Sequence, residues 1–213
     1  MGDATTGEKG TRARLENGHE GVLGTVFSRH RDRLWRVVHF RMDRRLHGRL
    51  DPDDVLQEGY LAAAKRLKHY DASVSPFVWL RGIVLQTLID LHRRHLGAQK
   101  RDAGRDLQIG AMRYPEATST SLAFELTGDF TSPSQAAVRA EVFEMVEEAI
   151  SGMKPVDQEV LALRHFEELS NAEVAEVLDI EPNAASNRYV RALRRLKDIL
   201  SDIPGITGED DDE

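Results

Sequence analysis

Apolar residues recur every three or four positions along most of the chain, a spacing that predicts α-helices. No segment shows the alternation of apolar and polar residues that would indicate a β-strand. The pattern predicts helices, in chain order, at about 19–48, 51–68, 75–97, 132–152, 156–166, 170–178 and 182–200. We therefore expect an all-α protein.

Several of these helices begin with a recognisable capping sequence. Asp51 and Ser75 each precede a proline, so their side chains can accept free backbone N–H groups while the proline occupies the first helical position. Ser170 and Glu173 have the spacing of a capping box. The helix they open is followed by a three-residue break and then by a longer helix that starts at Pro182. Two helices joined by so short a turn predict a helix-turn-helix.

An irregular segment separates the helices of the two halves. It contains Pro115, a Thr/Ser run at 118–121 and Gly128, which are typical of a flexible linker. The expected fold is therefore two small helical domains joined by a flexible linker, with the helix-turn-helix in the C-terminal domain. The expected boundaries are a disordered N-terminus at 1–18, a first domain at 19–105, a linker at 106–134, a second domain at 135–203 and an acidic tail at 204–213.

Charge is distributed unevenly between these parts. The 213 residues carry a net charge of −7, yet residues 22–105 hold 17 basic and 9 acidic side chains. Residues 137–203 hold 8 basic and 14 acidic side chains, and the segment Glu209–Glu213 adds five more acids. This asymmetry agrees with two separate modules. The tail has two interpretations, a solubilising segment or a competitor of DNA for a basic helix.

Composition excludes several classes of protein. The chain has no cysteine, which rules out disulfides, thiolate metal sites and a cysteine nucleophile. Its longest uninterrupted apolar stretch, Tyr60–Ala64, is far shorter than the ~20 residues that a membrane-spanning helix needs. The N-terminal residues include no apolar signal segment. We therefore expect a cytoplasmic protein that does not insert into membranes.

Enzymatic chemistry finds little support in the sequence. No Ser-His-Asp signature, phosphate-binding glycine loop or catalytic carboxylate pair is present. Asp90, His92 and His95 have a spacing that could bind a metal ion, but Arg93 and Arg94 lie between them and would repel a cation. We expect no enzyme, no catalytic residue, no metal and no cofactor.

The last predicted helix separates its apolar residues from its charged ones. Ala185, Tyr189 and Ala192 share one stripe with three leucines, and Arg188–Lys197 contains five basic residues and no acid. Positive charge on one helix of an acidic domain is what contact with DNA phosphates requires. The alternative is a surface helix whose arginines pair with nearby acids. The predicted DNA-binding residues are Asn183, Ser186, Asn187, Arg188, Arg191, Arg194 and Arg195.

A second basic region lies at the end of the first domain. Basic side chains near aromatic and amide groups suit single-stranded nucleic acid. The region comprises Trp79, Arg81, Gln86, Thr87, Arg93, Arg94, Lys100, Arg101 and Arg105. For Trp79 a place in the core is the stronger interpretation, since it adjoins Leu80 on an apolar stripe. The acids that open the helix at 51–68 are ordinary partners of the helix dipole.

Three segments together resemble a known family. They read DPDDVLQEGYLAAAKRLKHYD, FVWLRGIVLQTLIDLHRRHLGAQKRD and FEELSNAEVAEVLDIEPNAASNRYVRALRRLKDIL. In order and spacing these segments resemble bacterial RNA polymerase sigma factors of the extracytoplasmic-function (ECF) group. The resemblance covers about residues 20–105 and 135–202 and implies a transcription initiation factor that binds core RNA polymerase and promoter DNA, recognises the promoter and opens it.

The resemblance also implies roles for particular residues. The upstream promoter element would be read by the residues of the last helix given above. Core polymerase would bind Asp53, Asp54, Leu56, Gln57 and Glu58. The downstream promoter element would be contacted by Gln86, Thr87, Arg93, Arg94, Lys100 and Arg101. An anti-sigma factor is a further candidate partner. The remaining alternative is a helix-turn-helix regulator with a separate sensory or interaction domain.

Overall fold

The computed structural model describes residues 3–17, 20–43, 46, 48–96, 115–126 and 136–201. Every regular element within these ranges is helical, which confirms the all-α expectation. The chain divides between Arg105 and Asp106 into two compact units, here called the first unit and the second unit. None of the described helices is both long enough and apolar enough to span a membrane.

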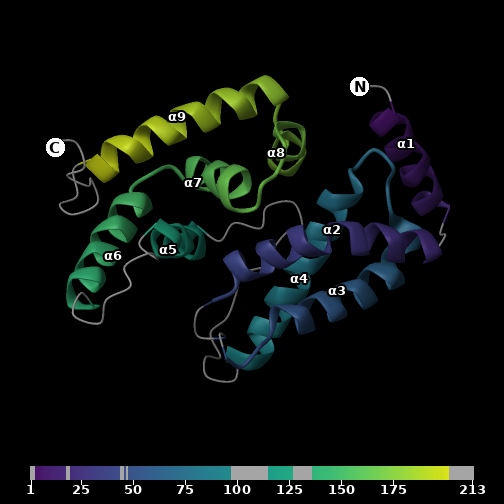
Figure 1. The fold of residues 1–213 in the computed structure, drawn as a ribbon, viewed down its shortest axis with the longest axis horizontal. Coiled ribbons are helices and arrows are strands. Elements are labelled where there is room, and N and C mark those ends of the chain that lie inside the picture. The colour runs from purple at the N-terminus through teal and green to yellow at the C-terminus, as the bar shows by residue number, and fades with distance from the viewer. Residues whose placement is uncertain are drawn as a thin grey trace, which may run out of the picture. The chain divides into compact units, whose positions relative to one another are not determined.

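The first unit is a bundle of helices (Figure 1). Its elements are α1 (Asp3–Glu16), α2 (Glu20–Arg41), α3 (Pro52–Arg66), a 3₁₀ turn (Leu67–His69) and α4 (Pro76–Leu96). Helices α2, α3 and α4 all pack against one another. The core between them is built from Leu23, Leu34, Val37 and Val38 of α2, Val55 and Ala63 of α3, and Leu80 and Val84 of α4, all fully buried or nearly so.

A glycine allows α3 and α4 to approach closely. A Cβ placed on Gly59 would lie 2.9 Å from Cγ2 of Val84, closer than real Cβ contacts come. The expected helix starts are also confirmed. Asp51 accepts a hydrogen bond from the backbone N–H of Asp53 at 2.8 Å, and Ser75 Oγ accepts one from that of Val78 at 3.1 Å. These caps fix where α3 and α4 begin.

The N-terminal segment differs from expectation. Residues 1–18 were predicted to be disordered, but Asp3–Glu16 forms α1. Leu15 is fully buried, and Arg12 Nη1 donates to the carbonyl oxygens of Ala72 and Ser73 at 3.5 and 3.4 Å. One apolar anchor and one long-range polar contact do not create a detectable periodicity, which explains why the sequence pattern missed this helix.

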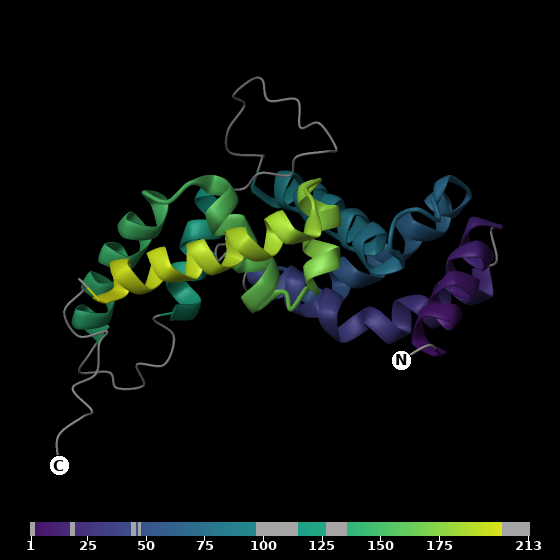
Figure 2. The same ribbon diagram turned by 90° about the horizontal axis from the view of Figure 1, so that it is seen from above.

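The second unit consists of shorter helices and one long one (Figures 1 and 2). Its elements are α5 (Pro115–Leu126), α6 (Ala136–Ser151), α7 (Pro155–Leu161), a π-helical turn (Ala162–Phe166), α8 (Asn171–Leu178) and α9 (Pro182–Ser201). The long helix α9 packs on α6, α7 and α8. Buried residues of the core include Val146 and Ile150 of α6 and Val160 and Leu161 of α7.

Part of the expected linker is ordered. Within 106–134, Pro115–Leu126 forms α5, which packs on α6 and α7. Leu122 and Ala123 are fully buried, and the hydroxyl groups of Thr118 and Thr120 contact the carboxylates of Glu159 and Glu147. The Thr/Ser run, which suggested a linker, is therefore the polar part of a packed helix. Two of its hydroxyl groups contact acids that are distant in the sequence. The acidic tail at 204–213 lies outside the described residues.

Candidate nucleic-acid interface

The helix-turn-helix of the second unit has the expected geometry. Ser170 and Glu173 form the predicted capping box, in which each side chain accepts the other's backbone N–H, at 3.2 and 2.8 Å. Helix α8 ends at Leu178, and its C-cap residue Asp179 has a left-handed φ of 52° and ψ of 51°. This conformation turns the chain sharply before Pro182 opens α9.

Two further contacts orient α9. Asn171 Nδ2 at the start of α8 donates to the carbonyl oxygen of Pro182 at 2.7 Å. Ala185 and Ala192 are buried, and because α9 packs on α7 and α8 these small side chains allow a close approach. The opposite side of α9 is thereby left facing solvent.

Most of the predicted upstream DNA-binding residues lie on this solvent side. Arg191 Nε donates to the carbonyl oxygen of Asn187 at 3.3 Å, which holds the guanidinium along the helix surface. The exposed members of the predicted set are Asn183, Ser186, Asn187, Arg191, Arg194 and Arg195. Polar and cationic side chains on one exposed helix face can contact base edges and phosphates together.

Arg188 is placed differently from the other arginines. Its Nη1 lies 3.3 Å from Oδ1 of Asp157 in α7, and the two side chains are only 30% and 14% exposed. Next to it, Arg164 stacks over the ring of Tyr189 with 5.2 Å between Cζ and the ring centroid, and donates to the carbonyl oxygen of Leu169. Arg188 therefore makes a structural contact between α9 and α7. This is the pairing with nearby acids that the alternative interpretation proposed for all the arginines of the helix.

The apolar stripe of α9 is less buried than its pattern suggested. Leu193 was expected to face the core, but it is 37% exposed. Val190, one turn before Leu193, is 42% exposed. The reason is that α7 and α8 pack mainly under the N-terminal part of the twenty-residue helix α9. Its C-terminal part lies over α6, with which its contact is smaller (Figure 2).

In the first unit, the side chains of two of the predicted downstream DNA-binding residues make hydrogen bonds within α4. Thr87 is buried and its hydroxyl donates to the carbonyl oxygen of Ile83 at 2.9 Å. Gln86 is half-buried, and its Nε2 donates to Oδ1 of Asp90 at 3.1 Å. Trp79 is half-buried and packs edge-on against the buried Tyr70 with ring centroids 5.0 Å apart, so it lies at the margin of the core.

The basic members of that set are more accessible. Arg93 and Arg94 are exposed at the end of α4, and Arg94 Nη2 donates to Oε2 of Glu58 in α3 at 2.9 Å. Arg81, part of the same basic run, is instead buried. Lys100 and Arg101 lie outside the described residues.

The predicted polymerase-binding residues occupy the first turns of α3. Asp54, Gln57 and Glu58 are exposed, and Asp53 is half-buried. Leu56 is 3% exposed and lies in the core, so the structure does not place it on the surface with the others. Val55 and Leu56 are buried, whereas Asp54, Gln57 and Glu58 are exposed. These three exposed residues therefore form the outer face of α3.

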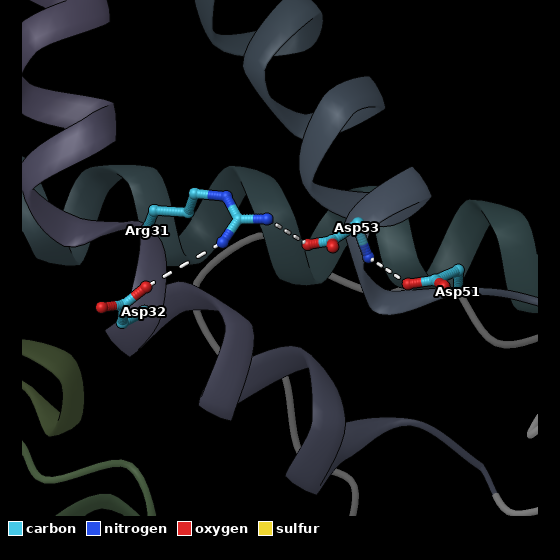
Figure 3. Close-up of polar contacts among 4 residues, drawn as sticks. All are labelled: Arg31, Asp32, Asp51 and Asp53. Carbon is cyan, nitrogen blue, oxygen red and sulfur yellow. Dashed lines mark hydrogen bonds and ion pairs between the residues drawn. The ribbon is translucent and has the colours of Figure 1, made fainter.

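The sequence pattern did not identify two residues near this face. Leu61 is 59% exposed and follows Gln57 by one turn, so an apolar side chain extends the acidic face of α3. The sequence signal that could have identified Leu61 is an apolar residue at helical spacing from the polar residues of this face. Arg31 of α2 donates to Asp53 at 2.8 Å and lies 3.9 Å from Asp32 (Figure 3). Its pairing across 22 residues could not be read from local spacing.

One of the histidines of α4 pairs with a carboxylate of the same unit. Nε2 of His92 lies 3.3 Å from Oδ2 of Asp43, beyond the end of α2. Among the residues that the structure describes, no group of three or more His, Cys, Asp or Glu side chains is arranged to hold a metal ion.

Comparisons with known proteins match both units. The profile "Sigma-70 region 2" matches residues 26–96, and the profile "Sigma-70, region 4" matches residues 143–196. The chain is 21% identical over 189 residues to the ECF RNA polymerase sigma factor SigW of Bacillus subtilis, covering 89% of this chain and 94% of SigW. It is 31% identical over 150 residues to the ECF RNA polymerase sigma factor SigD of Mycobacterium bovis, covering 70% of this chain and 63% of SigD.

A solved structure shares the fold. It is described as CnrH in complex with the cytosolic domain of CnrY, and the similarity has a TM-score of 0.50 at 21% identity, covering 91% of this chain and 97% of the other. A region 2 bundle followed by a region 4 helix-turn-helix defines a transcription initiation factor. The chain belongs to the sigma-70 family and is an RNA polymerase sigma factor of the ECF group. Sigma factors of this family bind core RNA polymerase and promoter DNA.

Proposed function

We propose that three surfaces of this sigma factor divide the work of initiation. The exposed side of α9 reads the upstream promoter element, chiefly through Asn183, Ser186, Asn187, Arg191, Arg194 and Arg195. The end of α4, with Arg93 and Arg94, and the following residues Lys100 and Arg101 contact the downstream element. The outer face of α3, formed by Asp54, Gln57 and Glu58, binds core polymerase in the cytoplasm. These surfaces are supported by the buried Leu56 and Thr87 and by Arg188, which pairs with Asp157, while Asp53 and Gln86 remain partly exposed beside them.

The arrangement of α9 carries this proposal. Its buried alanines fix one side against the protein, and three exposed arginines with three short polar side chains occupy the other. If each of Arg191, Arg194 and Arg195 neutralises one phosphate, log affinity should fall with log salt at a slope of about −2.7, which is −0.9 for each phosphate.

Reconstitution with bacterial core polymerase tests the assignment. The purified chain and core enzyme should initiate at a defined site on a genomic fragment library, and core enzyme alone should not. Retained duplex binding without association with core polymerase would instead favour a helix-turn-helix regulator. Neither association nor site-selective initiation would overturn the proposal.

An anti-sigma factor is the proposed regulator. The solved complex of CnrH with the cytosolic domain of CnrY supports it, because there a chain of similar fold has a protein bound. A candidate regulator should bind the purified chain and abolish initiation in the reconstituted assay. Excess of the chain should restore initiation. A binder that leaves initiation unchanged would not be such a factor.

A further inference from the structure

The solvent side of α2 carries two aromatic rings that no surface described above uses. Arg31, Trp35 and His39 follow one another at i, i+4 and i+8 and therefore share one face of the helix. The neighbouring residues Leu34, Val37 and Val38 are fully buried in the core, so Trp35 lies at the border between the buried and the exposed side of α2. The rings of this face are therefore accessible to solvent, that of His39 more than that of Trp35.

The two rings form a flat stack. The centroids of Trp35 and His39 are 4.8 Å apart, and their planes differ by 9°. His39 is exposed and Trp35 is half-buried. A tryptophan left partly exposed forgoes part of the stabilisation that full burial of its large apolar surface would give. An unpaired base, which presents a π-face of similar size, can recover it by stacking.

The charges around the stack suit a nucleic-acid strand. From Arg29 to Arg41, α2 carries five arginines and one acid, Asp32. Arg31 is held by its 2.8 Å contact with Asp53 while half of its side chain stays exposed (Figure 3). A cation fixed one turn from an aromatic stack is the combination that binds single strands without regard to sequence. Asp32, 91% exposed and beside Arg31, opposes this attraction.

We propose that Trp35 and His39 form a stacking platform for an unpaired base of single-stranded DNA, with Arg31 contacting the adjoining phosphate. The inference rests on the proposed function, because sigma-dependent promoter opening supplies such a strand. It adds to the first unit a second contact with the opened DNA, on α2 rather than α4.

Intrinsic fluorescence provides a direct test with the full chain. In a Trp79→Phe background Trp35 is the only tryptophan, and a 15-residue oligodeoxythymidylate should quench its emission. With a labelled oligonucleotide, Trp35→Ala should weaken binding by about five- to tenfold, the lower part of the range for one stacked base. Trp35→Phe, which keeps an aromatic face, should bind within about twofold of the parent.

Two charge variants should act in opposite directions. Arg31→Gln should weaken oligonucleotide binding and flatten its salt dependence, while Asp32→Asn should strengthen binding. Arg14→Gln on α1 makes the same charge change as Arg31→Gln away from the stack, and should leave binding near that of the parent. Circular dichroism melts should confirm that each variant is folded.

Absence of quenching, or equal oligonucleotide binding by Trp35→Ala and the parent, would overturn the platform. Loss of core polymerase binding by Trp35→Ala with unchanged oligonucleotide binding would assign the aromatic face to a protein interface instead, which also overturns it. If the parent fails to direct initiation with core enzyme while quenching persists, the proposed function fails and the platform stands.

Discussion

Arg94 at the end of α4 donates to Glu58 of α3 at 2.9 Å, so a residue proposed to contact DNA is paired with one proposed to contact polymerase. Both side chains are about half exposed, at 60% and 46%. Such an exposed pair contributes at most about 1 kcal/mol. Either ligand can therefore break it, and polymerase that engages Glu58 leaves Arg94 available to DNA.

Reversing the charge of Glu58 should impair polymerase binding. Glu58→Lys removes an exposed acid from the outer face of α3 and adds a cation beside Arg94. We expect association with core enzyme to weaken by tenfold or more, which corresponds to about 1.4 kcal/mol. Fluorescence anisotropy with labelled core enzyme would measure it.

Glu141→Lys provides a matched control, because Glu141 is exposed on α6 in the second unit. It should bind core enzyme as the parent does. Glu58→Gln separates the two roles of Glu58, since it releases Arg94 without adding a cation. Unchanged core binding by Glu58→Lys would refute the assignment of this face.

Leu56→Ala should unfold the first unit before it informs on binding. Leu56 is 3% exposed, and truncating a buried leucine costs about 2–5 kcal/mol. Thermal unfolding of the variant should occur well below that of the parent. Leu61→Ala is the contrasting change, because Leu61 is 59% exposed. It should leave the melting temperature nearly unchanged and reduce core binding if α3 docks through this face.

Arg191 and Arg188 should respond oppositely to substitution by alanine. Arg191 is exposed, so its loss should weaken DNA binding for all sequences and reduce the magnitude of the salt slope by about 0.9. Arg188 pairs with Asp157, and its loss leaves that carboxylate half-buried without a cation. Arg188→Ala should therefore lower the stability of the second unit. A salt slope unaffected by Arg191→Ala would contradict the phosphate contact.

Local sequence signals predicted the helices and their caps but not the contacts between distant residues. Asp51, Ser75 and the Ser170–Glu173 capping box act through backbone groups within three residues, so spacing alone reveals them. Helix α5 contacts acids 27 and 41 positions away, and α1 contacts a carbonyl group 60 positions away. Local periodicity does not contain such information.

The same reasoning explains why the burial of two site residues could not be predicted. Leu56 and Thr87 are buried although they stand in motifs with exposed members such as Glu58 and Arg93, and the motif does not reveal which helix face the core takes. Only the packing of α2, α3 and α4 determines that face. The assignment of the remaining site residues stays a prediction.

The turn that receives α1 should respond to acid. Hydrogen bonds from the backbone N–H and then the hydroxyl of Ser73 lower the pKa of Asp71 below its ordinary value of 3.8. A lowered folded pKa stabilises the fold above pH 3.8, and this contribution is lost as pH falls through the folded pKa. Carboxyl NMR titration should show it. Ser73→Ala keeps the backbone donor, so it should raise the pKa of Asp71 only partway toward its ordinary value. An unchanged pKa would show that the Ser73 hydroxyl does not contribute.

Ser170→Ala should loosen the helix-turn-helix without touching its DNA-facing side. The substitution leaves the backbone N–H of Glu173 at the start of α8 without its side-chain acceptor. Loss of such a cap costs about 1 kcal/mol. Since α8 positions α9 through Asn171 and the buried Ala185, the loss should weaken promoter binding by raising the population of misoriented α9.

Ser186→Ala is the matched control, because it removes the same hydroxyl from the exposed face of α9. It should leave the melting temperature of the second unit unchanged and alter only the preference for particular base pairs. Ser170→Ala should instead lower the melting temperature and weaken binding to all sequences alike. If the two variants behaved alike in both measurements, stability and base contact would not be separable on this motif, and the division of roles between α8 and α9 would be wrong.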